Sequence, residues 1–124
     1  LGIWMDHSTA EMIDLQTKDN IRKIESEFTY DLKVEVLDKS ESGMHNKKQQ
    51  MQEAYYKEIG LEVLKYDHVL LFGPTNARVE LNNYLDKDLH FKNIQIDVEA
   101  ADKMTDNEKV AFVRAHFEKG EIHE

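Results

Sequence analysis

The chain contains no cysteine, a single proline and only five glycines among its 124 residues. The lack of cysteine excludes disulfide bonds, thiolate metal sites and cysteine nucleophiles. With so little proline and glycine there is no flexible linker, and we expect one domain over residues 1–124. No apolar run approaches the roughly 18 residues that cross a bilayer, and no basic-then-apolar leader opens the chain. We therefore expect a cytoplasmic protein that does not enter a membrane.

Positive charge is also scarce, because 16 Lys and Arg stand against 25 Asp and Glu and give a formal net charge of −9. Nucleic-acid binding draws much of its strength from Lys and Arg side chains that neutralise phosphates. A domain this acidic repels polyanions at long range except where a local basic patch dominates. The composition argues against DNA binding and restricts any RNA contact to such a patch.

The clearest structural signal lies in residues 68–81, HVLLFGPTNARVEL. The uninterrupted apolar run Val69–Phe72 is typical of a strand that is covered on both faces. Pro74 can neither extend the strand ladder nor sit deep inside a helix, and Thr75 is a good N-cap. A helix is predicted to follow, with one apolar face formed by Ala77, Leu81, Tyr84 and Leu85.

The other elements follow from the same kinds of pattern. Three short strands joined by turns open the chain as an antiparallel meander, at residues 2–6, 10–15 and 21–28. Helical periodicity predicts a helix over 46–66, alternation predicts a half-exposed strand over 94–98, and a capping box predicts a last helix that begins at Thr105–Glu108. Residues 29–45 are predicted to be an extended, flexible excursion that ends in a loop at 40–43.

This β-β-β-α-β-α-β-α order predicts an α/β fold, in which a mixed five-stranded sheet carries helices on both faces. The first and fourth strands are the most apolar and belong at the centre, whereas the third and fifth are the most polar and belong at the edges. The strand order 3-2-1-4-5 satisfies both conditions. It is the arrangement of ribonuclease-H-like domains, and this is the fold that we predict.

Few residues point to catalysis or to a metal. Asp6 ends the first strand where a ribonuclease-H-like nuclease would hold a metal ion, but no second carboxylate follows the fourth strand. We favour a turn in which the Asp6 side chain bonds the backbone of Ser8 or Thr9. The six histidines have no close metal-ligand spacing, so surface or turn positions are predicted, with no metal and no cofactor.

A second candidate is the turn of Gly73, Thr75 and Asn76, which precedes a predicted helix. Free N–H groups and the helix dipole favour an anion there. The turn lacks the glycine spacing and the Lys-Ser/Thr ending of a P-loop, and turn formation alone also explains these residues.

The most distinctive polar cluster is His45, Asn46, Lys47, Lys48 and Gln49, at the predicted junction between loop and helix. It is rich in hydrogen-bond donors and locally basic within an acidic protein. One interpretation is a solvated helix start. The other is a binding site, because RNA phosphate would approach this chain most easily here.

Three stretches carry a resemblance to a known family: GIWMDHSTAEMIDL at 2–15, LLFGPTNARVELNNYL at 70–85 and DKMTDNEKVAFVRAHF at 102–117. They resemble small bacterial proteins related to the middle domain of the eukaryotic/archaeal-type peptide chain release factor and Pelota. The resemblance implies the ribonuclease-H-like fold of translational machinery components and a role at the ribosome. In the release factors a Gly-Gly-Gln motif precedes the first long helix, whereas residues 42–50 here read SGMHNKKQQ, with one glycine. The resemblance therefore carries over no catalytic residue and no peptidyl-tRNA hydrolysis.

We accordingly expect a translation-associated binding protein rather than an enzyme. Its expected partner is the ribosome, tRNA or a protein of that machinery. Two alternatives stay open. One is a metal-dependent phosphoester hydrolase that uses Asp6. The other is a homodimer formed through an edge strand, at Ile94–Val98 or Tyr30–Val36.

Overall fold

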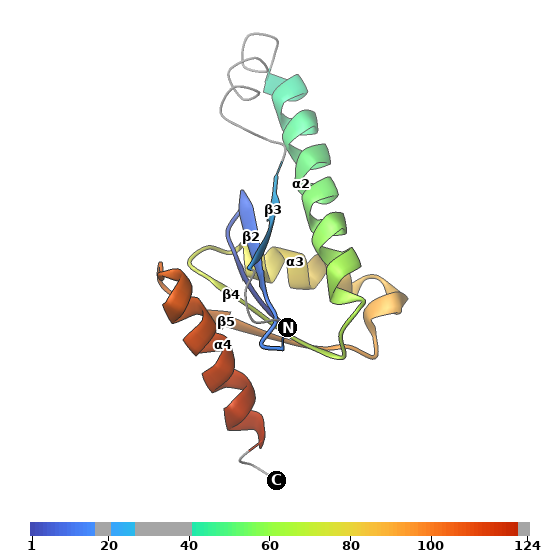
Figure 1. The fold of residues 1–124 in the computed structure, drawn as a ribbon. Helices are drawn as coiled ribbons and strands as arrows, with labels where there is room; N and C mark the ends of the chain where they lie inside the picture. Colours follow the sequence, from blue (N-terminus) through green and yellow to red (C-terminus); the bar gives the residue numbers. More distant parts are fainter. Residues whose placement is uncertain (17–20, 27–40, 122–124) are drawn as a thin grey trace.

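A computed structural model describes residues 1–16, 21–26 and 41–121 of the chain (Figure 1). Within these ranges the elements are, in order, β1 (Gly2–Met5), β2 (Thr9–Ile13), β3 (Arg22–Glu25), α2 (Glu41–Val63), β4 (His68–Gly73), α3 (Ala77–Asp86), the short 3-10 helix η1 (Leu89–Phe91), β5 (Gln95–Ala100) and α4 (Asp106–Glu121). The predicted alternation of strands and helices is confirmed.

The five strands form one mixed sheet in the order β3-β2-β1-β4-β5, which confirms the predicted order. β1 pairs antiparallel with β2 and β2 antiparallel with β3, whereas β1 with β4 and β4 with β5 are parallel pairs. The apolar strands β1 and β4 lie inside the sheet, where both faces are covered. The polar strands β3 and β5 lie at its edges. An edge strand can pair with a second copy of the chain, and a homodimer through β5 stays a prediction. The alternative edge at Tyr30–Val36 lies outside the described residues.

Side chains that alternate along each strand build two separate cores, one on each face of the sheet. From β4, Val69 and Leu71 pack with α2 and α3, while Leu70 and Phe72 pack with α4. Figure 1 shows α4 on one side of the sheet and α2 with α3 on the other, so the prediction of helices on both faces is confirmed.

The turn between β4 and α3 depends on Gly73, whose φ of +154° is rarely adopted by residues with a side chain. A Cβ at this position would lie 2.1 Å from the carbonyl oxygen of Met5, so neither backbone could approach the other as closely. The predicted N-cap of α3 is wrong by one residue, because Asn76 occupies that position. The hydroxyl of Thr75 still accepts a hydrogen bond from the N–H of Ala77, at 3.2 Å.

Other boundaries also differ from the predicted ones. α2 begins at Glu41, so residues 41–45 of the predicted excursion, including residues 41–43 of the predicted loop, are helical, and the helix ends at Val63. Ser and Gly are weak helix formers, but they cost about 1 kcal/mol or less each, which a helix of this length tolerates. The rest of the predicted excursion, residues 29–40, lies outside the described part of the chain. The capping box of α4 is confirmed, since Thr105 and Glu108 exchange hydrogen bonds of 3.1 and 3.3 Å.

Candidate functional site

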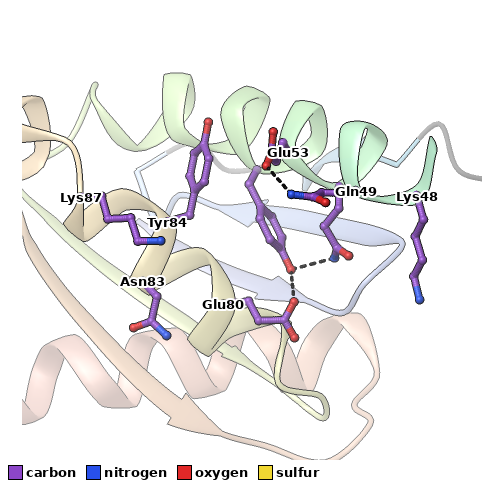
Figure 2. A pocket seen from close by; sticks show the side chains of 9 residues that line it. Lys48, Gln49, Glu53, Glu80, Asn83, Tyr84 and Lys87 are labelled. Atoms are coloured by element: carbon purple, nitrogen blue, oxygen red, sulfur yellow. Dashed lines mark hydrogen bonds between the residues drawn. The ribbon is translucent and has the colours of Figure 1, made fainter. Parts of the chain in front are cut away.

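A groove of about 490 Å³ lies between α2 and α3, and we call it the α2–α3 groove (Figure 2). Both helices cover the same face of the sheet, so the groove runs along the outer side of that layer. Its nine lining residues are Lys48, Gln49, Gln52, Glu53, Tyr56, Glu80, Asn83, Tyr84 and Lys87.

A hydrogen-bond network centred on Glu80 ties the two helices together. The Tyr56 hydroxyl donates to Glu80 Oε1 at 3.0 Å and accepts from Gln52 Nε2 at 2.8 Å. The second oxygen, Glu80 Oε2, lies 3.0 Å from Nε2 of His7, in the turn between β1 and β2. Glu80 of α3 is therefore held by partners from two other parts of the fold, α2 and the turn between β1 and β2.

The ionisation of these groups follows from their surroundings. Burial and the neighbouring Glu80 carboxylate raise the pKa of Tyr56, so the phenol keeps its proton and acts as a donor. Partial burial pushes the pKa of Glu80 upward, but the hydrogen bonds from His7 and Tyr56 outweigh it and leave that pKa below its ordinary value. The Glu80 charge is thus present at neutral pH and already engaged by protein donors.

The ends of the groove are basic. Figure 2 shows Lys48 and Lys87 at opposite ends, with Glu80 and Tyr84 between them. Within the described residues, neither lysine has a carboxylate at ion-pair distance, whereas Glu53 accepts a hydrogen bond of 3.4 Å from Gln49. The Tyr84 ring is half-buried beside the Tyr56 ring, with centroids 6.1 Å apart. The groove therefore offers an aromatic surface and two cations without an ion pair among the described residues, although the charge of Lys48 does help to lower the pKa of Glu80.

The cluster predicted from the sequence contributes only part of this groove. Lys48 and Gln49 line it, and Lys47 is exposed on α2 without lining it. His45 and Asn46 lie in the α2 backbone, but their side chains are outside the described part of the structure. The α3 half of the groove was missed. The signal for it is the helical spacing of Glu80, Asn83, Tyr84 and Lys87, but Tyr84 also fits the apolar face predicted for this helix and does pack against the core.

The predicted anion turn is only partly assembled. Gly73 and Asn76 line a hollow of about 290 Å³ together with Arg78 and Asp102, and Thr75 does not reach it. The Arg78 guanidinium donates to the Thr75 carbonyl, and the Thr75 hydroxyl is occupied by Ala77. The single cation is also opposed by the Asp102 carboxylate, so anion binding there stays a prediction.

Asp6 has the turn role that the sequence favours. Its Oδ1 accepts hydrogen bonds from the backbone N–H groups of Ser8 and Thr9, both at 2.8 Å, and from the Ser8 hydroxyl at 3.0 Å. Among the described residues, Asp6 belongs to no group of three potential metal ligands. The hydrolase alternative therefore gains no support from its proposed catalytic carboxylate.

A different set of potential ligands does come together, on the opposite face of the sheet. His68 of β4 and His116 of α4 both contact Asp97 of β5. The prediction that every histidine lies on the surface or in a turn is wrong for these two, since both are half-buried within regular elements. Local spacing could not reveal the cluster, because the three residues come from three elements.

No protein-family model matches this chain, and no curated protein matches it either. Within the described residues, no helix has the length and apolar character that a membrane span requires. The fold itself does not determine a function, since one α/β architecture supports many activities. The likeness to the release-factor middle domain stays a prediction, and function has to be inferred from the groove.

Proposed function

We propose that this protein binds RNA of the translation machinery, ribosomal or transfer RNA, through the α2–α3 groove and does not hydrolyse peptidyl-tRNA. The observation that carries the proposal is the pair of lysines that form no ion pair within the described part of the chain, at the two ends of a groove that also contains Tyr84. The resemblance of residues 2–15, 70–85 and 102–117 to the release-factor middle domain directs the proposal to translation, and hence to the cytoplasm.

The electrostatic part of the proposal depends on local charge. The protein as a whole carries −9 and repels a polyanion at a distance. Within the groove, the Glu80 carboxylate is bonded by Tyr56 and His7, while Lys48 and Lys87 have no such partner among the described residues. The neighbouring Lys47 adds a third cation at the same end of α2. The lysines therefore place positive charge at both ends of the groove, while the carboxylates of Glu53 and Glu80 keep negative charge within it.

The groove also has the side chains that contact bases. Tyrosine rings stack on bases of single-stranded RNA, and each such contact is worth about 1–3 kcal/mol. Tyr84 is partly exposed, and the groove also contains Asn83 and Gln49, whose amides both donate and accept hydrogen bonds. A single strand with its phosphates near the lysines and a base on Tyr84 fits this arrangement.

The test is fluorescence anisotropy with labelled tRNA and a short single-stranded RNA, measured over a range of salt concentrations. Lys48→Glu and Lys87→Glu should each weaken binding and lower the slope of log K against log salt by about 1. Lys57→Glu is the matched control, because Lys57 is an exposed lysine of α2 that does not line the groove. Lys57→Glu should change the RNA affinity and the salt slope less than Lys48→Glu or Lys87→Glu does.

Tyr84→Ala should cost about 1–3 kcal/mol of binding, while Tyr84→Phe keeps the ring and most of the affinity. Sedimentation of the protein with ribosomes at low salt gives a second measurement. No binding of either RNA together with no sedimentation would show the proposal to be wrong. Equal losses of RNA affinity in Lys57→Glu and Lys48→Glu would also overturn the proposal, because RNA would then be attracted by the whole surface and not by the groove.

A further inference from the structure

We propose that His68, Asp97 and His116 form a binding site for a divalent transition-metal ion, with Zn²⁺ the best match. One ligand atom from each of the three side chains lies within 4.8 Å of the other two. Asp97 Oδ2 is 2.6 Å from Nε2 of His68 and 2.8 Å from Nε2 of His116. Two imidazoles and a carboxylate with further positions open are a common donor set for zinc and for non-haem iron.

The fold explains why these three residues meet. His68 has the same strand parity as Leu70 and Phe72, so its side chain lies on the face of the sheet that α4 covers. Asp97 lies two residues after Gln95, the partner of His68 in the parallel pairing of β4 with β5. α4 packs on this same face of the sheet and places His116 against Asp97. Ligands on two paired strands and one packed helix are held more firmly than ligands on loops.

The ring positions are further restrained by Phe117. Its ring meets the His68 ring edge-on, with centroids 4.8 Å apart, and lies 5.3 Å from the His116 ring. A tetrahedral zinc ion with bonds of about 2.0–2.1 Å separates its ligand atoms by about 3.3 Å. The contacts of His68 and His116 to Asp97 therefore need to open by about 0.7 and 0.5 Å, and the two imidazole nitrogens, which lie within 4.8 Å of each other, need to reach the same separation. Small side-chain rotations provide these changes.

A second layer of polar groups is already in place. When Nε2 of His116 binds a metal, the ring proton moves to Nδ1, and Glu99 Oε1 lies 3.6 Å from that atom. Gln95 Nε2 donates to the other oxygen of Asp97 at 3.3 Å. Carboxylates and amides in these positions orient the ligands of known zinc sites and raise their basicity. The two carboxylates also balance the charge of a divalent ion.

The partial exposure of the three side chains leaves room for a further ligand on the metal ion. They are 37%, 28% and 18% exposed for His68, Asp97 and His116, so the cluster is neither sealed nor at the free surface. Three protein ligands in this setting leave one coordination position for water. Imidazole donors favour zinc, cobalt, nickel and copper over Mg²⁺ and Ca²⁺, which prefer oxygen.

The test is calorimetric titration of the untagged chain with ZnCl₂, and with MgCl₂ as the comparison. We expect one Zn²⁺ per chain, no comparable Mg²⁺ binding and a rise in melting temperature with Zn²⁺. His68→Ala, His116→Ala and Asp97→Asn should each lower the Zn²⁺ affinity by about 100-fold or more, and Glu99→Gln by about tenfold. The matched control is His90→Ala. His90 also contacts an aspartate, Asp88, at 2.6 Å, but it is exposed and belongs to no group of three potential ligands in the described ranges.

Nuclear magnetic resonance of the imidazole groups gives a measurement that does not depend on how well a variant folds. Zn²⁺ should shift the His68 and His116 resonances of the unmodified protein before those of other histidines. Absent binding, or binding that shifts other histidines first, would overturn the proposal. So would an equal loss of affinity in His90→Ala. Lys48→Glu, on the other face of the sheet, should leave Zn²⁺ binding unchanged whether or not the groove binds RNA.

Discussion

The two faces of the sheet are covered in different ways. Under α2 and α3 the buried contacts come from apolar side chains and tyrosines, and the charged groups, such as Glu80 and His7, lie at the rim. Under α4 a smaller apolar core includes a buried ion pair, in which Lys109 Nζ donates to Glu11 Oε2 at 2.6 Å with both side chains less than 10% exposed. One face depends on apolar burial, and the other also depends on matching buried charges.

The buried pair is surrounded by further polar constraints. The Lys109 ammonium lies 4.1 Å from the centre of the Trp4 ring, which favours a cation at that place. Among the described residues, Glu11 Oε1 and Trp4 Nε1 have no hydrogen-bond partner. Such a pair adds little net stability, but it penalises any placement of α4 that separates the two charges. The α4 face is therefore sensitive to any change that leaves one of these two charges buried without the other.

The largest effect should come from Lys109→Ala. Removal of the cation leaves the Glu11 carboxylate buried without a countercharge, and we expect a loss of about 3–5 kcal/mol in the free energy of unfolding. Urea denaturation followed by circular dichroism measures this loss. The double variant Lys109→Met with Glu11→Leu should recover most of it, because an apolar pair of similar volume has no desolvation cost. A single variant that loses less than about 1 kcal/mol would mean that the pair is solvated.

A matched pair of valines compares the apolar packing of the two faces. Val63 of α2 and Val113 of α4 are both fully buried. Val63→Ala should cost about 2 kcal/mol, from the lost methyl groups and the cavity that they leave. Val113→Ala should cost less, about 1 kcal/mol, because α4 packs alone on its face and can settle toward the sheet. Equal losses in urea denaturation would show that the two cores are equally rigid.

The smallest effect concerns Glu80, at the rim of the α2–α3 face. Its pKa in the folded protein lies below the ordinary 4.5, so its ionised form stabilises the fold above that pH. This contribution is lost as the pH falls below 4.5 and through the folded pKa. Because the side chain is 46% exposed, it amounts to only a few tenths of a kcal/mol, about what exposed pairs provide.

Glu80→Gln should therefore show a weaker fall in melting temperature between neutral and acid pH than the unmodified protein. Glu58→Gln is the control, since Glu58 is exposed on α2 and has no hydrogen-bond partner among the described residues. An unchanged acid dependence in Glu80→Gln would contradict the role given to the His7 and Tyr56 contacts.

The sheet could be predicted because strand position and strand polarity are coupled. Val69–Phe72 and Gly2–Met5 are apolar on both faces, and only the centre of a sheet buries both faces. The start of α2 could not be placed, because Ser42 and Gly43 are weak helix formers whose local preference is overridden by the rest of a long helix.

The sites were harder to predict than the sheet. Lys48 and Gln49 stood out through local composition, but their partners on α3 are more than 30 residues away in the chain. His68, Asp97 and His116 have no local signal at all. Each is the single ligand of its own element, and they meet only because β4 pairs with β5 and α4 crosses above both.

The parallel pairing of β1 with β4 has a consequence for how the protein is made. Gly2 lies opposite Leu70 and Trp4 opposite Phe72, so the central seam of the sheet joins segments nearly seventy residues apart. A ribosome that adds about 5–20 residues per second delivers β4 several seconds after β1. During that time the nascent strands β1, β2 and β3 lack β4, and the edge of β1 that pairs with β4 has no partner. Closure of such distant contacts is slow, and this protein can complete the centre of its sheet only after β2, β3 and α2 have been synthesised.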